Sequence, residues 1–245
     1  MKESVKGTVI YPRYFSLRRN FGNIRRWWRS LEPGHNSMTD ASPWICFEAI
    51  DILEQFLRSD MRIFEYGSGG STLFFSQRSR EVISVEHHRD WFHRVNDYCA
   101  QSGITNIRYF LIEPETDPGF GTKQKSNPEH YISDDAESKG KHFERYATAI
   151  DAYADESFDV VIVDGRARPS CCAHAVPKVK TGGMLVFDNV ETEYYGDAVR
   201  LLSPDSWDVR KVYGAVPYIK HFSMTLLAIK KHHRTNAGGS VKSIQ

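Results

Sequence analysis

The sequence has no uninterrupted run of eighteen apolar residues, so it predicts no transmembrane helix. Its N-terminal segment lacks the apolar core of an export signal. Its four cysteines include no C-x-x-C pair, which argues against a zinc knot or a disulfide framework. A formal net charge of only +1 provides no overall attraction to nucleic acid or to membranes. These absences predict a cytoplasmic protein with reduced cysteines and no nucleic-acid partner.

The remaining composition is that of a globular protein, with 40% hydrophobic and 26% charged residues. A chain of 245 residues is long enough for one α/β domain with additions. We expect a basic and aromatic arm over residues 1–41, a main α/β domain over 42–231 that carries an insertion at 115–150, and a mobile polar tail over 232–245.

The stretch IFEYGSGGST, residues 63–72, has the pattern of a strand, a glycine turn and a helix start. Gly67, Gly69 and Gly70 allow a tight turn and a close approach to a ligand that a Cβ would prevent. Ser71 and Thr72 are residue types that favour helix N-termini. This order of elements is the nucleotide-binding opening of an open α/β sheet.

The glycine spacing and the acid before it distinguish this site from a dinucleotide-binding site. Counted from Gly67, the dinucleotide pattern would place a glycine at position 72, where the sequence has Thr72. Glu65 instead precedes the glycines, and Glu86 ends the next predicted strand, EVISVE at 81–86. A carboxylate about twenty residues beyond the glycines offers two acceptors to the two hydroxyls of a ribose. We expect His87, directly after Glu86, to lie near the ribose or the adenine.

Further strands and helices alternate along the chain, as they do in open α/β sheets. The sequence predicts strands at 106–112, 158–165 and 184–188, and two paired strands between 207 and 231 that close the sheet. It predicts helices at 43–58, where Ser42 is the expected N-cap, and at 72–79, 89–102 and about 146–154. A later helix is expected to bend or break at Pro177.

Taken in order, IFEYGSGGST, SVEHH, FDVVIVDG and GGMLVFDN resemble the motifs of class I S-adenosylmethionine (SAM) methyltransferases. The resemblance covers residues 42–230 and implies a Rossmann-like, seven-stranded, mostly parallel sheet with helices on both faces and one antiparallel strand. It implies SAM as the methyl donor. The expected cofactor-binding residues are Glu65, Gly67, Ser68, Gly69, Ser71, Thr72, Glu86 and His87.

The ends of two later strands resemble those of catechol-type, metal-dependent O-methyltransferases. That resemblance implies that Asp164, Asp188 and Asn189 hold Mg²⁺, a hard cation that prefers oxygen ligands. One position departs from the family pattern, because Ala167 stands where these enzymes have a lysine base. Arg166 and Arg168 flank it, and arginine is a poor base but a good clamp for an anion. We therefore expect catalytic roles for Asp164, Arg166 and Asp188, with the metal left open.

The DGRAR segment resembles that of bacterial methyltransferases associated with sugar and polysaccharide modification. The expected function is O-methyl transfer from SAM to a small hydroxylated or saccharide acceptor, with or without Mg²⁺. His130, His142 and His174 are candidate bases. Two main alternatives stay open, a nicotinamide-dependent oxidoreductase and a non-catalytic SAM-binding scaffold. A weaker third is a polyamine transferase that uses decarboxylated SAM.

The arm and the insertion each allow two interpretations. In the arm, five arginines interleave with Phe21, Trp27 and Trp28. In the interpretation that we favour, the aromatic residues pack on the domain while the arginines stay solvated. In the other, the arm contacts an anionic membrane or an acidic glycan. The polar insertion at 115–150 is a lid or substrate loop, or a disordered surface segment.

Overall fold

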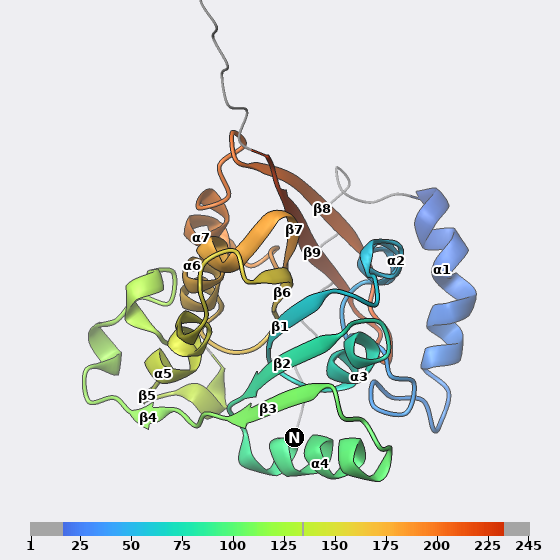
Figure 1. The fold of residues 1–245 in the computed structure, drawn as a ribbon, viewed down its shortest axis with the longest axis horizontal. Coiled ribbons are helices and arrows are strands. Elements are labelled where there is room, and N and C mark those ends of the chain that lie inside the picture. Colours follow the sequence, from blue (N-terminus) through green and yellow to red (C-terminus); the bar gives the residue numbers. More distant parts are fainter. Residues whose placement is uncertain (1–16, 134, 233–245) are drawn as a thin grey trace, which may run out of the picture.

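The computed structural model describes residues 17–133 and 135–232. They form a seven-stranded sheet in the order β3-β2-β1-β6-β7-β9-β8 (Figure 1). The first five strands are mutually parallel, β9 is antiparallel to both of its neighbours, and β8 therefore runs with the parallel set. The predicted Rossmann-like methyltransferase fold, including its single antiparallel strand, is confirmed.

The strands follow the sequence predictions closely at their carboxyl ends, where the site lies. The parallel strands are β1 (Arg62–Tyr66), β2 (Glu81–Glu86), β3 (Ile107–Leu111), β6 (Phe158–Val163) and β7 (Val179–Phe187). β7 begins five residues before the predicted strand. The closing hairpin consists of β8 (Trp207–Ala215) and β9 (Phe222–Lys230). The central strands are buried on both faces, as their almost continuous apolar runs require.

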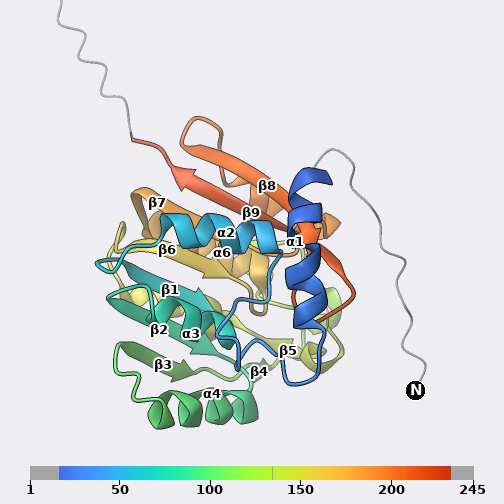
Figure 2. The ribbon, with the colours of Figure 1, turned by 90° about the vertical axis from the view of Figure 1, so that its right-hand side faces the viewer.

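One face of the sheet is covered by α2 (Phe47–Phe56), α3 (Gly70–Ser76) and α4 (Arg89–Gln101) (Figure 2). α4 matches its predicted range to within one residue. The predicted start of α2 is wrong, because the helix begins at Phe47 and its N-cap is Cys46 instead of Ser42. Ser42 instead lies against the glycine turn, and its carbonyl oxygen would be 2.6 Å from a Cβ at Gly70. Tertiary packing of this loop has overridden a local capping signal.

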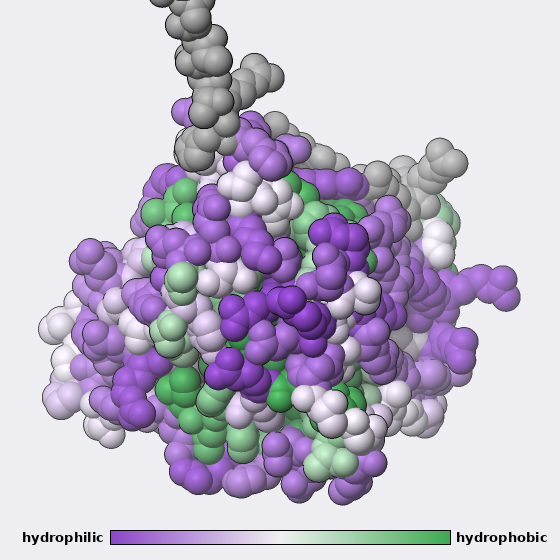
Figure 3. Space-filling view, in the orientation of Figure 1, coloured by the Kyte–Doolittle hydropathy of each residue, from purple (hydrophilic) through white to green (hydrophobic). Residues whose placement is uncertain are grey.

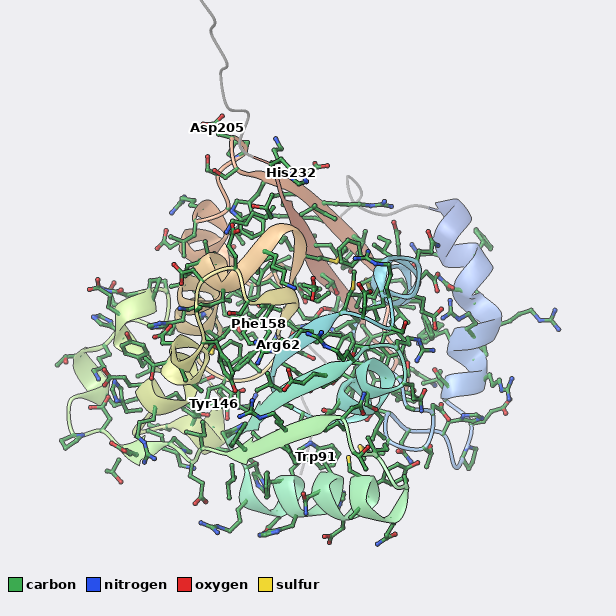
Figure 4. All side chains as sticks on the ribbon, viewed as in Figure 1. Arg62, Trp91, Tyr146, Phe158, Asp205 and His232 are labelled. Atoms are coloured by element: carbon green, nitrogen blue, oxygen red, sulfur yellow. The ribbon has the colours of Figure 1, made fainter. Side chains whose placement is uncertain are left out.

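The other face carries α5 (Glu144–Ala147), the 3₁₀ helix η4 (Thr148–Ala152), α6 (Arg168–Lys178), the 3₁₀ helix η5 (Glu193–Tyr195) and α7 (Gly196–Arg200). The helix predicted at about 146–154 is thus an α-turn continued by a 3₁₀ helix. Pro177 is the last residue but one of α6, so it ends this helix and does not break its interior. Arg62 and Phe158 lie together at the amino ends of β1 and β6, away from the site (Figure 4).

Two additions surround this core. The arm contains α1 (Leu17–Ser30), and residues 1–16 lie outside the described part of the chain. The insertion forms a two-stranded ribbon, β4 (Glu115–Thr116) with β5 (Lys141–His142), and the 3₁₀ turns η1 (Phe120–Thr122), η2 (Pro128–His130) and η3 (Ala136–Ser138). The tail predicted over 232–245 lies outside the described residues except for position 232. None of the described helices is long and apolar enough to cross a membrane.

Candidate functional site

A cavity of about 820 Å³ opens at the carboxyl ends of β1, β2, β6 and β7. This is the edge at which open α/β sheets bind ligands. Six of the eight predicted cofactor residues line the cavity, namely Gly67, Ser68, Gly69, Ser71, Glu86 and His87. Glu65 and Thr72 are not among the lining residues. The structure therefore brings the predicted residues to one place, with six in the cavity wall and the other two behind it, beneath the glycine turn.

The glycine turn is packed so closely that side chains are excluded at two positions. Gly67 has a φ of +86°, and a Cβ there would lie 2.9 Å from the Cα of Gly165. A Cβ at Gly70 would lie 1.9 Å from the carbonyl oxygen of Ser37. The turn is thus clamped between the end of β6 and the loop that precedes α2. This packing holds the main chain of residues 67–71 against the cavity.

Glu65 lies beneath the glycine turn. Its side chain is fully buried, and its Oε2 accepts hydrogen bonds from the hydroxyls of Thr72, at 2.6 Å, and Ser84, at 2.8 Å. The Thr72 hydroxyl oxygen also accepts the main-chain N–H of Gly69 at 3.0 Å. Burial raises the pKa of Glu65 to about 7, against the lowering effect of the nearby hydroxyls. Glu65 thus supports the turn from beneath, and its expected role in binding SAM stays a prediction.

Glu86 belongs to the cavity wall. Its Oε2 accepts the main-chain N–H of Ser68 at 3.1 Å and the Ser68 hydroxyl at 2.7 Å. Its Oε1 accepts the main-chain N–H groups of His87 and His88 at 2.8 and 2.9 Å. Burial alone would raise the pKa of Glu86, but these donors and the imidazole of His87 lower it to about 2. Glu86 is therefore a carboxylate anion across the physiological pH range.

The two carboxylates project from the same face of the sheet. Glu65 pairs in register with Ser84, which lies two residues before Glu86 on the neighbouring strand. Side chains two residues apart on a strand point to the same face. The register of β1 and β2 therefore places Glu65 and Glu86 on one face of the sheet at neighbouring strand ends.

The opposite part of the cavity is built from the ends of β6 and β7. Asp164, Arg166, Arg168, Asp188 and Asn189 all line it. Asp188 is 2% exposed, and its Oδ1 accepts the hydroxyl of Thr225 on β9 at 2.6 Å. Burial raises the pKa of Asp188 well above its usual value, and the charge of Asp164 adds to this shift. Arg166 reaches across to the insertion, where its Nε lies 3.1 Å from Oδ2 of Asp135.

The residues expected to hold Mg²⁺ already surround a cation, the guanidinium of Arg168. Its Nη2 lies 3.0 Å from Oδ1 of Asp164, and its Nη1 lies 4.0 Å from Oδ2 of Asp188. Nη1 also donates to Oδ1 of Asn189 and to the carbonyl oxygen of Asp188, both at 2.8 Å. No cluster of three or more acidic, histidine or cysteine side chains suited to a metal occurs within the described ranges.

We therefore correct the expected metal site, because the donor set of Asp164, Asp188 and Asn189 does not fit Mg²⁺. A magnesium ion requires these oxygens at about 2.1 Å in octahedral geometry, in the volume that the guanidinium occupies. The like charges of the two cations would also oppose each other at this distance. Although burial lowers the pKa of Arg168, the nearby Asp164 raises it above its usual value, so its charge is fixed.

The candidate histidine bases lie elsewhere. His130, His142 and His174 are not among the residues that line the cavity. His174 is held between Oδ2 of Asp151, at 2.7 Å, and the hydroxyl of Tyr131, at 3.2 Å. These contacts tie α6 to the insertion, so His174 has a structural position. We withdraw the three histidines as candidate bases on this ground of location.

Sequence reasoning missed several residues of the cavity wall. Trp91, from the first turn of α4 (Figure 4), donates its indole N–H to the carbonyl oxygen of Ser68 at 2.8 Å and lies beside Gly69. The turn between β8 and β9 adds Val216, Ile219 and His221. The sequence contained a signal for this turn, because it predicted two paired strands between residues 207 and 231. If β8 runs with the parallel strands, its following turn must lie at the ligand edge.

The insertion also contributes to the wall, through Ser133, Asp135 and Glu137. It is therefore a folded segment within its described residues, and it lies at the edge of the sheet where a lid would act. Whether it opens and closes stays a prediction.

Comparisons with known proteins extend only to the fold. No protein-family model and no curated protein sequence matches the chain. A solved structure from Klebsiella pneumoniae, provisionally named an O-methyltransferase, matches with a TM-score of 0.53 at 13% identity and covers 88% of this chain and 89% of its own. A structure from Streptococcus mutans, provisionally named a methyltransferase and solved with S-adenosylhomocysteine (SAH), matches with a TM-score of 0.51 at 14% identity. The match covers 74% of this chain and 94% of its own.

A provisional rRNA methylase from Clostridium thermocellum matches with a TM-score of 0.52 at 10% identity and covers 76% of this chain and 94% of its own. The names of these proteins point to different activities, and at such low sequence identities no activity can be assigned to this chain from them. The shared architecture does transfer. The chain has the class I SAM-dependent methyltransferase fold.

Proposed function

We propose that the protein is a SAM-dependent O-methyltransferase that acts on a small hydroxylated or saccharide acceptor without a bound metal ion. The observation that carries the proposal is the position of Glu86, an ionised carboxylate in the cavity wall directly beside the glycine turn. Its Oε2, which the Ser68 hydroxyl can release, suits a hydroxyl of the ribose, and the neighbouring main chain of residues 67–71 suits the methionine part of SAM. The structure of the S. mutans protein in complex with SAH supports this assignment by analogy.

The hydroxyl of Ser68 is the group that the ribose would replace. It donates to Glu86 and lies 2.5 Å from the hydroxyl of Tyr109. When a ribose hydroxyl donates to Oε2 of Glu86, the Ser68 hydroxyl retains Tyr109 as its partner. Binding then exchanges one hydrogen bond for another at a fixed carboxylate, with little reorganisation of the site.

The acceptor would lie toward the ends of β6 and β7, where the lining is polar. Asp188, Arg168, Glu191, His221 and Ser223 border this part of the cavity. The sulfonium of SAM is a strong electrophile, so alignment of the acceptor oxygen with the methyl group supplies much of the rate. In our proposal Asp188 accepts the hydroxyl proton through Oδ2, since Thr225 engages Oδ1. Arg168 supplies positive charge beside the oxygen as it loses its proton.

The strand order weighs against the nicotinamide alternative. Dinucleotide-binding sheets have the order 3-2-1-4-5-6, whereas here the antiparallel β9 lies between β7 and β8. Isothermal calorimetry with SAM, SAH and NAD tests the cofactor. We expect micromolar binding of SAM and SAH and no binding of NAD. Micromolar binding of NAD without binding of SAM would overturn the proposal.

A screen with methyl-labelled SAM against hydroxylated aromatic compounds, sugars and nucleotide sugars tests the reaction. We expect label in an ether linkage, and we expect Asp188→Asn to lower the rate by about 10²–10⁴-fold at unchanged SAM affinity. Asp197→Asn, an exposed aspartate on α7, is the matched control. Binding of SAM with no methylated acceptor would favour the scaffold alternative.

A further inference from the structure

α1 differs from the other helices in its charge. Its fourteen residues, LRRNFGNIRRWWRS, contain five arginines and no acidic residue. Figure 3 shows that the face of the molecule turned to the viewer is mainly hydrophilic and that its hydrophobic residues form small separate groups. The outward side of α1 instead combines large exposed apolar side chains with exposed arginines.

One face of α1 holds the helix on the closing hairpin. The indole N–H of Trp27 donates to the carbonyl oxygen of Ile219 at 2.9 Å, and its ring lies 5.8 Å from that of Phe222. The hydroxyl oxygen of Ser30 accepts the main-chain N–H of Tyr218 at 3.1 Å. Of the three aromatic residues that the favoured interpretation packs on the domain, Trp27 does so, whereas Phe21 and Trp28 are exposed.

A second face of α1 points away from the protein. Phe21, Ile24 and Trp28 have the spacing i, i+3, i+7, which places them on one side of a helix. Their exposed fractions are 68%, 38% and 60%, so this side is not covered by the described residues. Burying large aromatic side chains contributes strongly to association, and their exposure marks an interaction surface.

Arginines border this apolar face. Arg25 and Arg29, spaced i, i+4, lie exposed along one side of it. Arg26 points elsewhere, toward Asp51 at 2.5 Å and over the ring of Phe47. An exposed apolar side flanked by a row of cations is the pattern of a helix that lies in the interface of an anionic membrane.

Other occupants fit this surface less well. An acidic glycan pairs with arginines and stacks its sugar rings on aromatic side chains, but it buries less of a continuous apolar face that also includes the aliphatic Ile24. A second copy of the chain that packed with its α1 antiparallel to this one would form an isologous contact, in which the arginine row of one copy faces that of the other. A bilayer surface with anionic lipids satisfies both features, because acyl chains accept the rings and phosphates accept the guanidinium groups.

We propose that α1 docks the protein on an anionic lipid surface. The helix is joined through Trp27 and Ser30 to residues 218–219, and the same hairpin turn lines the cavity through Val216, Ile219 and His221. In Figure 2, α1 lies on the side of the molecule toward which the parallel strands β1, β2 and β3 point. Docking through α1 would thus bring the ligand edge of the sheet close to the lipid surface.

Co-sedimentation of the full chain with vesicles tests this proposal. We expect binding to vesicles of 70% phosphatidylcholine and 30% phosphatidylserine, weaker binding to pure phosphatidylcholine, and a loss of binding as the salt concentration rises. Arg25→Glu should reduce the partition coefficient by about fivefold or more, the factor that corresponds to about 1 kcal/mol per surface-bound cation. Phe21→Ser and Trp28→Ser should reduce it by a similar factor on both kinds of vesicle.

Matched controls lie on the opposite edge of the sheet. Phe110→Ser and Arg108→Glu change a 40% exposed aromatic residue and an exposed arginine on β3, and both should leave vesicle binding unchanged. Thermal unfolding confirms that each variant is folded.

Three results would overturn the proposal. The first is an equal loss of vesicle binding in the α1 and β3 variants. The second is binding of the protein to heparin without binding to vesicles. The third is a concentration-dependent dimer that dissociates in the Trp28→Ser variant. Each outcome is independent of SAM binding and of methyl transfer.

Discussion

The hydroxyl and the main-chain N–H of Ser68 both donate to the same oxygen of Glu86, at 2.7 and 3.1 Å. This pair joins the glycine turn after β1 to the end of β2 and fixes the carboxylate in the cavity wall. The turn, the carboxylate and the bound ribose of our proposal therefore depend on one another.

Replacement of Glu86 by alanine should weaken SAM binding by about 1–3 kcal/mol, because charge-assisted hydrogen bonds to the ribose are lost. Calorimetry measures the change. Glu81→Ala is the matched control, since Glu81 lies at the other end of the same strand and pairs with Arg62. Unchanged SAM affinity in Glu86→Ala would show that the ribose binds elsewhere.

The buried Glu65 should make the stability of the protein depend on pH. Its pKa in the folded state is about 7, above the ordinary value of 4.5, so the folded state binds the proton more tightly. Its contribution to stability is complete below pH 4.5 and is lost as the pH rises through 7. The free energy of unfolding should therefore fall by roughly 2–4 kcal/mol across this window on account of this group.

The variant Glu65→Gln removes that titration. Urea unfolding between pH 4.5 and 8 should show a smaller fall for the variant than for the wild type, by the same amount. The shift of Glu86 acts in a separate window, below pH 4.5, because its pKa is depressed to about 2. If the free energies of unfolding of the two proteins changed in parallel between pH 5 and 7, this result would contradict the raised pKa of Glu65.

The contact of Gly70 with the preceding loop should make this position intolerant of any side chain. Gly70→Ala would push a Cβ to 1.9 Å from the carbonyl oxygen of Ser37, so either the loop or the turn must move. We expect a destabilisation of about 1–3 kcal/mol and a loss of SAM affinity. Gly196→Ala is the control, because a Cβ at this first residue of α7 meets no atom within 4 Å. Equal thermal stability of the two variants would contradict this packing.

The guanidinium of Arg168 should be necessary for catalysis, and divalent cations should not. Lysine carries its donors on a single nitrogen and cannot reach the places that Nη1 and Nη2 of Arg168 occupy at once, so Arg168→Lys should lower the rate by roughly 10²-fold or more. Arg145→Lys, at an exposed ion pair with Glu115, is the control. Wild-type activity should persist in a chelator. A loss that magnesium restores would return the metal to the site.

The local sequence predicted most of the sheet and much of the site. Alternating or continuous apolar runs predicted β2 and β6, and the position of an acid at the end of β2 predicted a carboxylate in the cavity wall. These predictions succeeded because strand formation and strand-end polarity depend on neighbouring residues. The N-cap at Ser42 failed for the opposite reason, since this residue is drawn onto the glycine turn by contacts with a later part of the chain.

The sequence by itself determined an open α/β sheet with Glu65 and Glu86 on adjacent strands, because residue periodicity and spacing fix which strands form and where they end, and the resemblance of its motifs implied the class I methyltransferase fold. Only the tertiary structure decided that Glu65 lies beneath the turn while Glu86 faces the cavity, and that Arg168 fills the place expected for a metal. It also decided that the β8–β9 turn and the insertion complete the wall. These outcomes depend on the packing of side chains that lie far apart in the sequence, and no local pattern specifies that packing.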